Sequence, residues 1–512
     1  MHPLSTAFTL PLYGVAATRR LEQQAAAALP PHTLMQRAGL AAARLALALA
    51  PHAQQIWIAC GPGNNGGDGL EAAMHLHQWG KTVTVTWLGE RAEREGKLPA
   101  DALASLLRAR ACGLAFAEAP PTGFDIAIDA LLGIGATPRP GDSSTEAVRM
   151  ADWMHLLRSS SAPVLALDIP SGLDADTGTD IAPEFIASSP YHARDGSKFC
   201  LSFLTLKPGL FTAAGRDLAG QVWWDDLGVT PPAGMAPDVW LAGQDRCSAS
   251  GRGQARHSSH KGLFGDVAIV GGASAGTHMA GAALLAGRAA LYAGAGRVFV
   301  ALLGSPVLTV DPQQPELMFR SPDALDLAVQ TVVCGCGGGD AVAAVLPRIL
   351  SRAPTLVLDA DGLNAVAGDT SLQALLRARA ARGWRTLLSP HPLEAARLLD
   401  SSTAAVQANR LDAAARLAAL FQCGVVLKGS GTVIAAPGAI PVINPTGNAR
   451  LATAGTGDVL AGMLGAALAA GRPAFEASCG AVFQHGRLAD DWPANQTLTA
   501  SLLTQNHQTD LQ

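Results

Sequence analysis

Charged side chains are scarce in this sequence, and their signs nearly balance. Asp, Glu, Lys and Arg make up 15% of the 512 residues, and the formal net charge is −4. A broad nucleic-acid surface needs clustered Lys and Arg, so we expect no nucleic-acid partner. Any phosphate group that the protein binds is then held locally, by backbone amides.

Paired cysteines are also missing. The eight cysteines are scattered, and none shows the CxxC spacing of a zinc site or a disulfide framework. Cys334 and Cys336 lie close together in 334-CGCGGG-339, and we interpret them as small residues at the end of a buried strand.

No segment predicts export or insertion into a membrane. The N-terminal stretch lacks a basic region ahead of its apolar residues, so we expect no signal peptide. The tract 279-MAGAALLAGRAALYAGAG-296 is rich in Ala and Gly and is interrupted by Arg288, which predicts a buried helix and not a membrane span. We therefore expect a cytoplasmic protein without a membrane partner.

The length and the apolar pattern predict two α/β domains. A chain of 512 residues is too long for one core. Short apolar runs alternate with Ala- and Leu-rich helical patterns, which is typical of βαβ units and a mostly parallel sheet. We expect strands at 56–59, 82–88, 125–129, 163–169, 201–206, 266–272, 298–303, 331–335, 355–360, 386–389 and 425–429, and helices at 20–29, 33–50 and 69–80.

A segment rich in Pro, Gly, Ser and Ala, 230–262, separates the two halves and shows little periodicity, as expected of a linker. We predict a first domain at 1–230, a linker at 231–255 and a second domain at 256–505.

The first glycine-rich stretch, 61-GPGNNGGDG-69, follows the strand expected at 56–59 and leads into a helix. Glycines allow backbone amides to approach a phosphate, and a helix N-terminus favours negative charge. The stretch is neither GxGxxG nor a Walker A sequence. An ordinary glycine-rich turn is the alternative.

Polar residues follow two further strands of the first half. The loop 130-ALLGIGATPRPG-141 follows one and 170-PSGLDADTG-178 follows the other, which places Asp129 and Asp168 at strand ends, where an open parallel sheet binds ligands. Together with Asn65 and Ser171 they could hold a hard cation through oxygen atoms, although the spacing does not select the metal. Each aspartate could instead cap a helix or form a turn.

These motifs, with 206-LKPGL-210, resemble the NAD(P)H-hydrate epimerase domain over residues 10–228. The resemblance implies a Rossmann-like, three-layer domain that interconverts the R and S forms of hydrated NADH and NADPH. It implies that K⁺ is bound by Asn65, Asp129 and Ser171, and that Asp168 is the catalytic acid/base. The segment 184–200 is longer and more irregular than this family predicts. The residues implied to contact the hydrated dinucleotide are Asn64, Asn65, Gly66, Gly67, Asp68, Gly133, Ile134, Gly135, Ala136, Thr137, Pro138 and Arg139.

The second glycine-rich stretch, 453-TAGTGDVLAGML-464, carries the clearest mechanistic signal. Gly455, Gly457 and Asp458 stand at the start of a long apolar helix, whose free amides form an anion hole. An aspartate beside it could remove a proton from a hydroxyl group. This arrangement resembles the ribokinase-like fold, and the alternative is a helix in which Asp458 only favours the dipole.

Three other loops of the second half suit the same chemistry. The turn 428-KGSGT-432 offers a lysine, two glycines and two hydroxyls to nucleotide phosphates, and His391 follows a strand between two prolines. The acidic pair in 359-DADG-362 could organise Mg²⁺ through water or cap a helix.

The second half resembles the ADP/ATP-dependent NAD(P)H-hydrate dehydratase domain over residues 255–500. The resemblance implies that Asp458 is catalytic and that Ala282, Gly337 and His391 also bind the hydrated substrate. Two departures are a shift of about one residue in the loop 271–282, and Cys336 where the family more often has Pro. The residues implied to bind the nucleotide are Lys428, Gly429, Ser430, Gly431, Thr432 and Gly457.

Together the halves imply repair of nicotinamide cofactors that have taken up water. We expect NADHX, NADPHX and ADP as small-molecule partners, Mg²⁺ with ADP, K⁺ at the epimerase site, and a homo-oligomer. The alternative is a small-molecule kinase of the ribokinase type joined to a non-catalytic dinucleotide-binding module.

Overall fold

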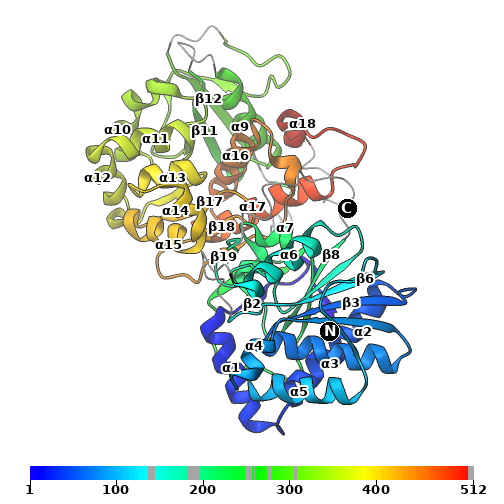
Figure 1. Cartoon of the computed structure of the whole chain (residues 1–512). Coiled ribbons are helices and arrows are strands. Elements are labelled where there is room, and N and C mark those ends of the chain that lie inside the picture. Colours follow the sequence, from blue (N-terminus) through cyan, green and yellow to red (C-terminus); the bar gives the residue numbers. More distant parts are fainter. Residues whose placement is uncertain are drawn as a thin grey trace. The chain divides into compact units, whose positions relative to one another are not determined.

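The computed structural model describes residues 1–135, 144–181, 197–247, 257–258, 260–273, 279–304 and 308–505. The chain forms two compact units (Figure 1). Unit 1 comprises Met1–Ser5 with Pro11–Asp238, and unit 2 comprises Thr6–Leu10 with Val239–Gln512. The division at 238/239 lies inside the predicted linker, and two short elements of unit 2 also lie there, so the bounds 1–230, 231–255 and 256–505 stay a proposal.

Unit 1 is built on an eight-stranded sheet in the order β1-β9-β8-β7-β6-β3-β4-β5. All neighbours are parallel except β1, which pairs antiparallel with β9. The strands are β1 (His2–Pro3), β3 (Gln55–Cys60), β4 (Thr82–Trp87), β5 (Ala115–Ala117), β6 (Ile126–Ala130), β7 (Val164–Leu167), β8 (Lys198–Phe203) and β9 (Gln221–Asp225). The α-helices are α1 (Val15–Ala28), α2 (Thr33–Leu49), α3 (Asn64–Gln78), α4 (Glu90–Arg94), α5 (Ala100–Ala111), α6 (Thr145–Ser159) and α7 (Gly215–Ala219).

The sheet of unit 1 is covered on both faces, which makes three layers. In β3, Ile56 and Ile58 join a core with α2, α3 and α5, whereas Trp57 joins a second core with α6. Helices α2, α3 and α5 lie side by side on their face (Figure 1). A strand that is apolar at successive positions is the expected form of a parallel strand buried on both faces.

Helix α3 begins at Asn64, five residues before the predicted start at 69, so the prediction of a loop over 64–68 is wrong. The reason is close packing. A Cβ atom at Gly66 would lie 1.8 Å from the carbonyl oxygen of Gly61, and one at Gly67 would lie 2.6 Å from the Met35 side chain. These glycines let the first turns of the helix lie against the rest of the unit.

Unit 2 is built on an eleven-stranded sheet in the order β13-β12-β11-β14-β15-β16-β17-β18-β19-β10-β2, and of β2 only Leu10 is assigned to this unit. Neighbours are parallel from β13 to β17, and β17, β18 and β19 then run antiparallel. The strands are β2 (Leu10–Leu12), β10 (Val239–Leu241), β11 (Asp266–Gly271), β12 (Arg297–Leu302), β13 (Met318–Phe319), β14 (Thr331–Cys334), β15 (Thr355–Leu358), β16 (Arg385–Leu388), β17 (Gly424–Leu427), β18 (Val433–Ala435) and β19 (Val442–Ile443).

Helices α9, α16 and α17 share one core with this sheet. Val333 and Val357 belong to that core, and the alternate residues Val332, Leu356 and Leu388 are also fully buried, so both faces are covered. The α-helices are α8 (Gln244–Cys247), α9 (Ala280–Tyr292), α10 (Val342–Arg352), α11 (Ala360–Gly368), α12 (Thr370–Ala378), α13 (Pro392–Leu398), α14 (Thr403–Ala408), α15 (Arg410–Phe421), α16 (Thr456–Ala469), α17 (Ala474–Asp490) and α18 (Ala500–Gln505).

The prediction of two α/β units is confirmed. Strand β14 ends at Cys334, and Cys334 and Cys336 are both buried, as predicted. Within the described residues, every helix is too short or too polar to cross a bilayer.

Candidate functional site

A pocket of about 680 Å³ opens in unit 1 where β3, β6, β7 and β8 end. Seven of the residues predicted to contact the substrate or act on it line this pocket. Gly66 and Gly67 are not among the lining residues, because they pack against the interior of the unit. Ala136, Thr137, Pro138 and Arg139 lie outside the described residues. The seven are Asn64, Asn65, Asp68, Gly133, Ile134, Gly135 and Asp168.

The three residues predicted to bind a cation lie together beneath the pocket loops. The Ser171 hydroxyl donates to Asp129 Oδ1 over 2.6 Å, and the Ser171 amide donates to Asp129 Oδ2 over 2.9 Å. Asn65 Nδ2 donates to the carbonyl oxygen of Leu132, whose own amide donates to Ser171 Oγ. Asn65 Oδ1 is buried and accepts no hydrogen bond among the described residues. Oxygen atoms of the kind that hard cations prefer are therefore gathered at one place.

Asp168 stands just past β7 with a left-handed backbone, φ 65°. Its carboxylate forms an ion pair with Lys207, whose side chain is completely buried. Lys207 also donates to the carbonyl oxygen of Phe203 at 2.8 Å and to Ser202 Oγ at 3.2 Å. The lysine thus has a fixed position and holds the Asp168 side chain at the pocket wall.

Helix α1 contributes charged residues to the same pocket that the sequence did not single out. Arg19 and Glu22 line it, and Arg19 Nη2 would lie 2.7 Å from a Cβ atom at Gly135. Burial raises the pKa of Glu22, and the nearby Asp168 raises it further. Burial also raises the pKa of Asp68 well above its ordinary value, with Asp168 and Glu22 adding to the effect.

In unit 2, the second glycine-rich stretch forms the start of α16. Gly455 precedes the helix with φ 90°, a conformation that favours glycine. The first amides of the helix have no partner within it, and Asp458 follows them in the first turn. Burial raises the pKa of Asp458 to about 6, and the charge of Asp359 adds to the effect.

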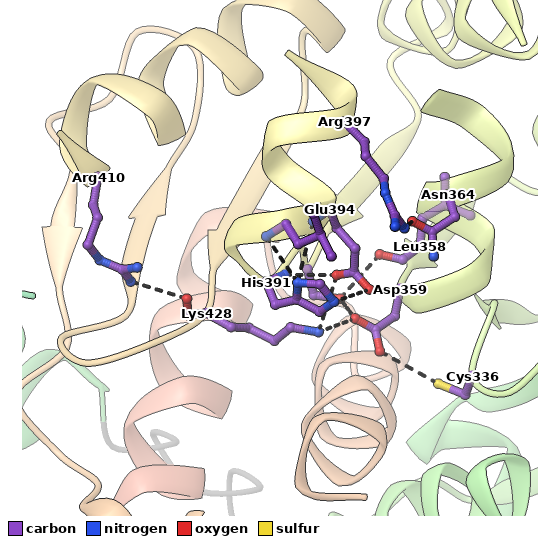
Figure 2. A network of polar contacts seen from close by, with 11 residues as sticks. Cys336, Leu358, Asp359, Asn364, His391, Glu394, Arg397, Arg410 and Lys428 are labelled. Carbon is purple, nitrogen blue, oxygen red and sulfur yellow. Dashed lines mark hydrogen bonds and ion pairs between the residues drawn. The ribbon is translucent and has the colours of Figure 1, made fainter. Parts of the chain in front are cut away.

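A network of polar side chains joins the other predicted loops around Lys428 and Asp359 (Figure 2). Asp458 lies beside this network, with a carboxylate oxygen within 4.8 Å of one of Asp359. Lys428 Nζ donates to Asp359 Oδ1 at 2.6 Å and lies 3.9 Å from Glu394 Oε2. It also lies 3.7 Å from the position of a Cβ atom at Gly457, so the lysine of one loop reaches the start of α16. The attraction of Asp359 and Glu394 outweighs burial and raises the pKa of Lys428.

Cys336 lies on the other side of Asp359, with Sγ 3.9 Å from Asp359 Oδ2. Ligand atoms of Cys336, Asp359 and Asp458 all lie within 4.8 Å of one another. Burial raises the pKa of the Cys336 thiol well above its usual value. Because Mg²⁺ prefers oxygen ligands, the carboxylates of this group suit that ion, whereas the protonated thiol does not.

The turn 428–432 is held from behind by Arg410. This buried guanidinium donates to the carbonyl oxygens of Leu427 and Lys428 at 3.2 Å each. Gly429 and Gly431 both have positive φ, and a Cβ atom at Gly429 would lie 2.9 Å from Arg410. The arginine and the glycines together set the path of this loop, and Ser430 is exposed on it.

His391 has a structural role that the sequence left open. It caps α13: Nδ1 accepts from the amides of Leu393 and Glu394, and Glu394 Oε2 accepts from the His391 amide at 2.8 Å. The side chain is 46% exposed, so the cap leaves it able to meet a ligand. Its contact with substrate stays a prediction.

Ala282 and Gly337, both predicted to meet the substrate, are neighbours. A Cβ atom at Gly337 would lie 2.9 Å from the Ala282 side chain and 2.7 Å from the carbonyl oxygen of Met279. The first turn of α9 and the loop after β14 therefore approach closely.

Comparison with known proteins accounts for both halves. One family model, described as YjeF-related protein N-terminus, matches residues 31–209, and another, described as NAD(P)H-hydrate dehydratase, matches residues 267–509. The bifunctional NAD(P)H-hydrate repair enzyme Nnr of Escherichia coli (strain K12) is 36% identical over 493 residues, which cover 92% of this chain and 88% of that protein. The chain belongs to the family of bifunctional NAD(P)H-hydrate repair enzymes.

Two further relatives match the dehydratase half of this repair-enzyme family. The ADP-dependent (S)-NAD(P)H-hydrate dehydratase of Neisseria meningitidis serogroup B is 43% identical over 48% of this chain and 83% of its own length. The crystal structure of the ADP/ATP-dependent NAD(P)H-hydrate dehydratase of Bacillus subtilis, co-crystallized with ATP and Mg²⁺, is 30% identical over 48% of this chain and 89% of that chain, with a TM-score of 0.41.

The sequence missed several residues of these two sites. Arg19 and Glu22 lie on a helix that carries no motif, and Lys207 lay in the motif LKPGL without a role. Glu394 could have been found as the acidic residue three positions after the helix cap at His391, as in a capping box.

Proposed function

We propose that this chain repairs hydrated nicotinamide cofactors in two steps. Unit 1 interconverts the R and S forms of NADHX and NADPHX, and unit 2 dehydrates the S form with ADP, giving NAD(P)H, AMP and phosphate. One observation carries the proposal: in each unit the motif loops gather around one carboxylate, Asp168 in the first and Asp458 in the second. A lysine ion pair accompanies each site, through Lys207 and Lys428.

In unit 1 the hydrated dinucleotide occupies the pocket. The first amides of α3, at Asn64 and Asn65, offer hydrogen bonds to its phosphates. Asp168 then reaches the hydroxyl-bearing ring and moves its proton. The Gly133–Gly135 loop leaves room for the ligand because it carries little side-chain bulk.

The residues of the cation site fit K⁺. Asn65 Oδ1 is a buried acceptor without a donor among the described residues, and Asp129 and Ser171 add oxygen atoms. We assign K⁺ to Asn65, Asp129 and Ser171. When bound, this ion supplies a positive charge beside the phosphates of the dinucleotide.

In unit 2 Asp458 removes the proton of the ring hydroxyl as its oxygen takes the phosphoryl group of the nucleotide. Gly457 and its neighbouring amides stabilise the negative charge that develops on the phosphoryl oxygens. The C–O bond then breaks with its electron pair leaving on phosphate, the adjacent ring carbon gives up a proton to the released phosphate, and the C–H electron pair forms the ring double bond. Lys428 and the turn to Thr432 hold the nucleotide, while Ala282, Gly337 and His391 contact the hydrated ring.

Mg²⁺ would bind to the nucleotide phosphates, and the carboxylates of Asp359 and Asp361 would hold it through water. This ion neutralises phosphate charge when bound. We further propose a cytoplasmic homo-oligomer.

The test uses a mixture of R and S NADHX with ADP, Mg²⁺ and K⁺, followed by the absorbance of regenerated NADH. Complete recovery of NADH by the unmutated chain, together with recovery limited to the S fraction in Asp168→Ala, supports both assignments. Recovery that stops at the S fraction in the unmutated protein contradicts an epimerase. No recovery, with phosphoryl transfer to other alcohols, would indicate a kinase instead.

A further inference from the structure

Asp68 is a carboxyl group of the epimerase pocket that the mechanism above does not use. It lines the pocket together with Asp168. Among the described residues, no group donates a hydrogen bond to it. It is partly buried on the second turn of α3, just past the amides of Asn64 and Asn65 that the proposed function assigns to the dinucleotide phosphates.

The other carboxylates around Asp68 mostly have partners. Glu71 accepts from Ser105 at 2.5 Å and from Arg108, and Asp101 pairs with His32 at 2.5 Å. Asp168 pairs with Lys207. Glu22 resembles Asp68 in forming no hydrogen bond or ion pair among the described residues. The groups around Asp68 are Arg19 and Glu22 of α1, His32, Cys60 of β3, Glu71 of α3, Asp101 and Arg108 of α5, Asp168 and Lys207.

This surplus of carboxyl groups favours a bound proton on Asp68. Burial disfavours a negative charge on Asp68 most strongly, and the nearby Asp168, Glu22 and Glu71 add to the effect. Lys207 cannot offset this, because it is engaged with Asp168. The pocket therefore holds one carboxyl group, Asp168, that is paired with a lysine, and another, Asp68, that has no such partner. Two carboxyl groups in such different surroundings are suited to act as base and acid.

The proposed reaction needs such a pair. Water adds to the enamine double bond of a dihydronicotinamide so that the hydroxyl group lies on the carbon beside the ring nitrogen. That carbon inverts if its C–N bond opens to an aldehyde, the aldehyde turns, and the nitrogen closes on the other face. Opening requires a base at the hydroxyl and an acid at the nitrogen.

We propose that Asp68 is a second catalytic residue of the epimerase site, the proton donor to the ring nitrogen, while Asp168 takes the hydroxyl proton. On opening, the O–H electron pair forms the C=O bond and the C–N pair passes to nitrogen, which accepts the proton of Asp68. On closure, nitrogen returns that proton to Asp68, and the oxygen regains its proton from Asp168. Both residues end in their starting states. This assignment rests on the proposed epimerase function.

The test compares Asp68→Asn with the unmutated full chain, without nucleotide so that dehydration is silent. Conversion of R to S NADHX is measured by chromatography across a pH series in K⁺. We expect Asp68→Asn to lower kcat at least 100-fold, the order that general acid catalysis contributes, with KM changed only a few-fold. The unmutated rate should fall at alkaline pH as Asp68 loses its proton, and the residual rate of the variant should lack that fall.

Two control variants sharpen the result. Asp152→Asn, on the exposed side of α6, should behave like the unmutated chain. ADP-dependent dehydration of the S form and thermal unfolding show whether the Asp68 variant is intact. A rise in KM with unchanged kcat would make Asp68 a binding residue only and overturn the proposal. If Glu22→Gln abolished the decrease of the epimerisation rate at alkaline pH and Asp68→Asn did not, the proposal would be overturned, with Glu22 as the proton donor. If the unmutated chain does not convert R to S, the epimerase function itself fails.

Discussion

At the scale of single residues, both candidate sites depend on a lysine paired with an aspartate. Lys207 is completely buried against Asp168, and Lys428 donates to the buried Asp359. Removing one partner of such a pair leaves an uncompensated charge, which is strongly destabilising. Both lysines lie in short motifs, LKPGL and KGSGT, whereas neither aspartate partner can be identified from the motif that holds the lysine.

Asp129→Asn should weaken the cation site of unit 1. The amide keeps an oxygen atom near Ser171 but removes the negative charge, and ligand charge is a main determinant of cation affinity. We expect the K⁺ concentration for half-maximal epimerisation to rise by roughly tenfold or more. Titrating K⁺ against R to S conversion measures this, and ADP-dependent dehydration should not change. An unaltered K⁺ requirement would contradict the assignment.

The dehydratase should lose activity in mild acid. Asp458 must be ionised to accept a proton, and burial raises its pKa to about 6. The rate on the S form should therefore be near its plateau above pH 7 and fall about tenfold per pH unit well below pH 6. A kcat/KM profile from pH 5 to 8 measures the fall. Asp458→Asn should remove most of the activity, and a flat acid limb in the unmutated chain would argue against Asp458 as the base.

At the scale of elements, the two glycine-rich stretches form helix starts for different physical reasons. The glycines of α3 allow close packing, since a Cβ atom at Gly66 would meet the backbone of Gly61. At α16, Gly455 supplies a positive φ, and Gly457 leaves space beside Lys428. Both stretches have a similar glycine-rich composition in the sequence, and only the contacts around each one distinguish their roles.

Gly66→Ala should destabilise unit 1. The new methyl group would meet a carbonyl oxygen at 1.8 Å, and backbone cannot move aside as a flexible side chain can. Overpacking of this kind costs about 1–3 kcal/mol in the free energy of unfolding. Hydrogen exchange of the amides of α3 and β3 measures it. Gly63→Ala is the matched control, because no atom lies within 4 Å of its Cβ position, and equal effects in the two variants would contradict the packing argument.

The apolar pattern was sufficient to predict some elements and too weak to predict others. Strands β3 and β11 are apolar after their first residues, Gln55 and Asp266, and both were predicted within a residue or two. Helix α6 was missed because it buries only Trp153, Met154 and Leu157 among its fifteen residues. The antiparallel return of β18 and β19 was also missed, since strands of three and two residues carry almost no periodic signal.

At the scale of the whole molecule, the N-terminal segment does not belong only to the first unit. Thr6–Leu10 is part of unit 2, next to β10 and α8. The amide and hydroxyl of Thr9 donate to Asp245 Oδ1 at 2.8 and 2.7 Å, and the Gly243 amide donates to Thr9 Oγ1. The second unit is therefore not contained in residues 239–512 alone.

Removing residues 1–12 should destabilise unit 2 although its own motifs remain. The truncation removes strand β2 and the hydrogen bonds of Thr9. Each of these hydrogen bonds contributes about 1 kcal/mol to the free energy of unfolding. We expect the dehydratase to inactivate at a lower temperature, with partial recovery when a peptide of residues 1–12 is added. Thr9→Ala should reproduce part of the loss and Phe8→Ala little of it, because Phe8 is 66% exposed. Unchanged heat resistance after truncation would contradict this role.

The sequence by itself determined the two α/β units, the two motif sets and the chemistry that they imply. It could do so because apolar periodicity and backbone requirements act over a few neighbouring residues. Only the tertiary structure decided which distant side chains meet. Lys207 reaches Asp168 across 39 positions, Lys428 reaches Asp359 across 69, and Thr9 reaches Asp245 across 236. Such pairs depend on the order of strands in a sheet, which no local sequence pattern records.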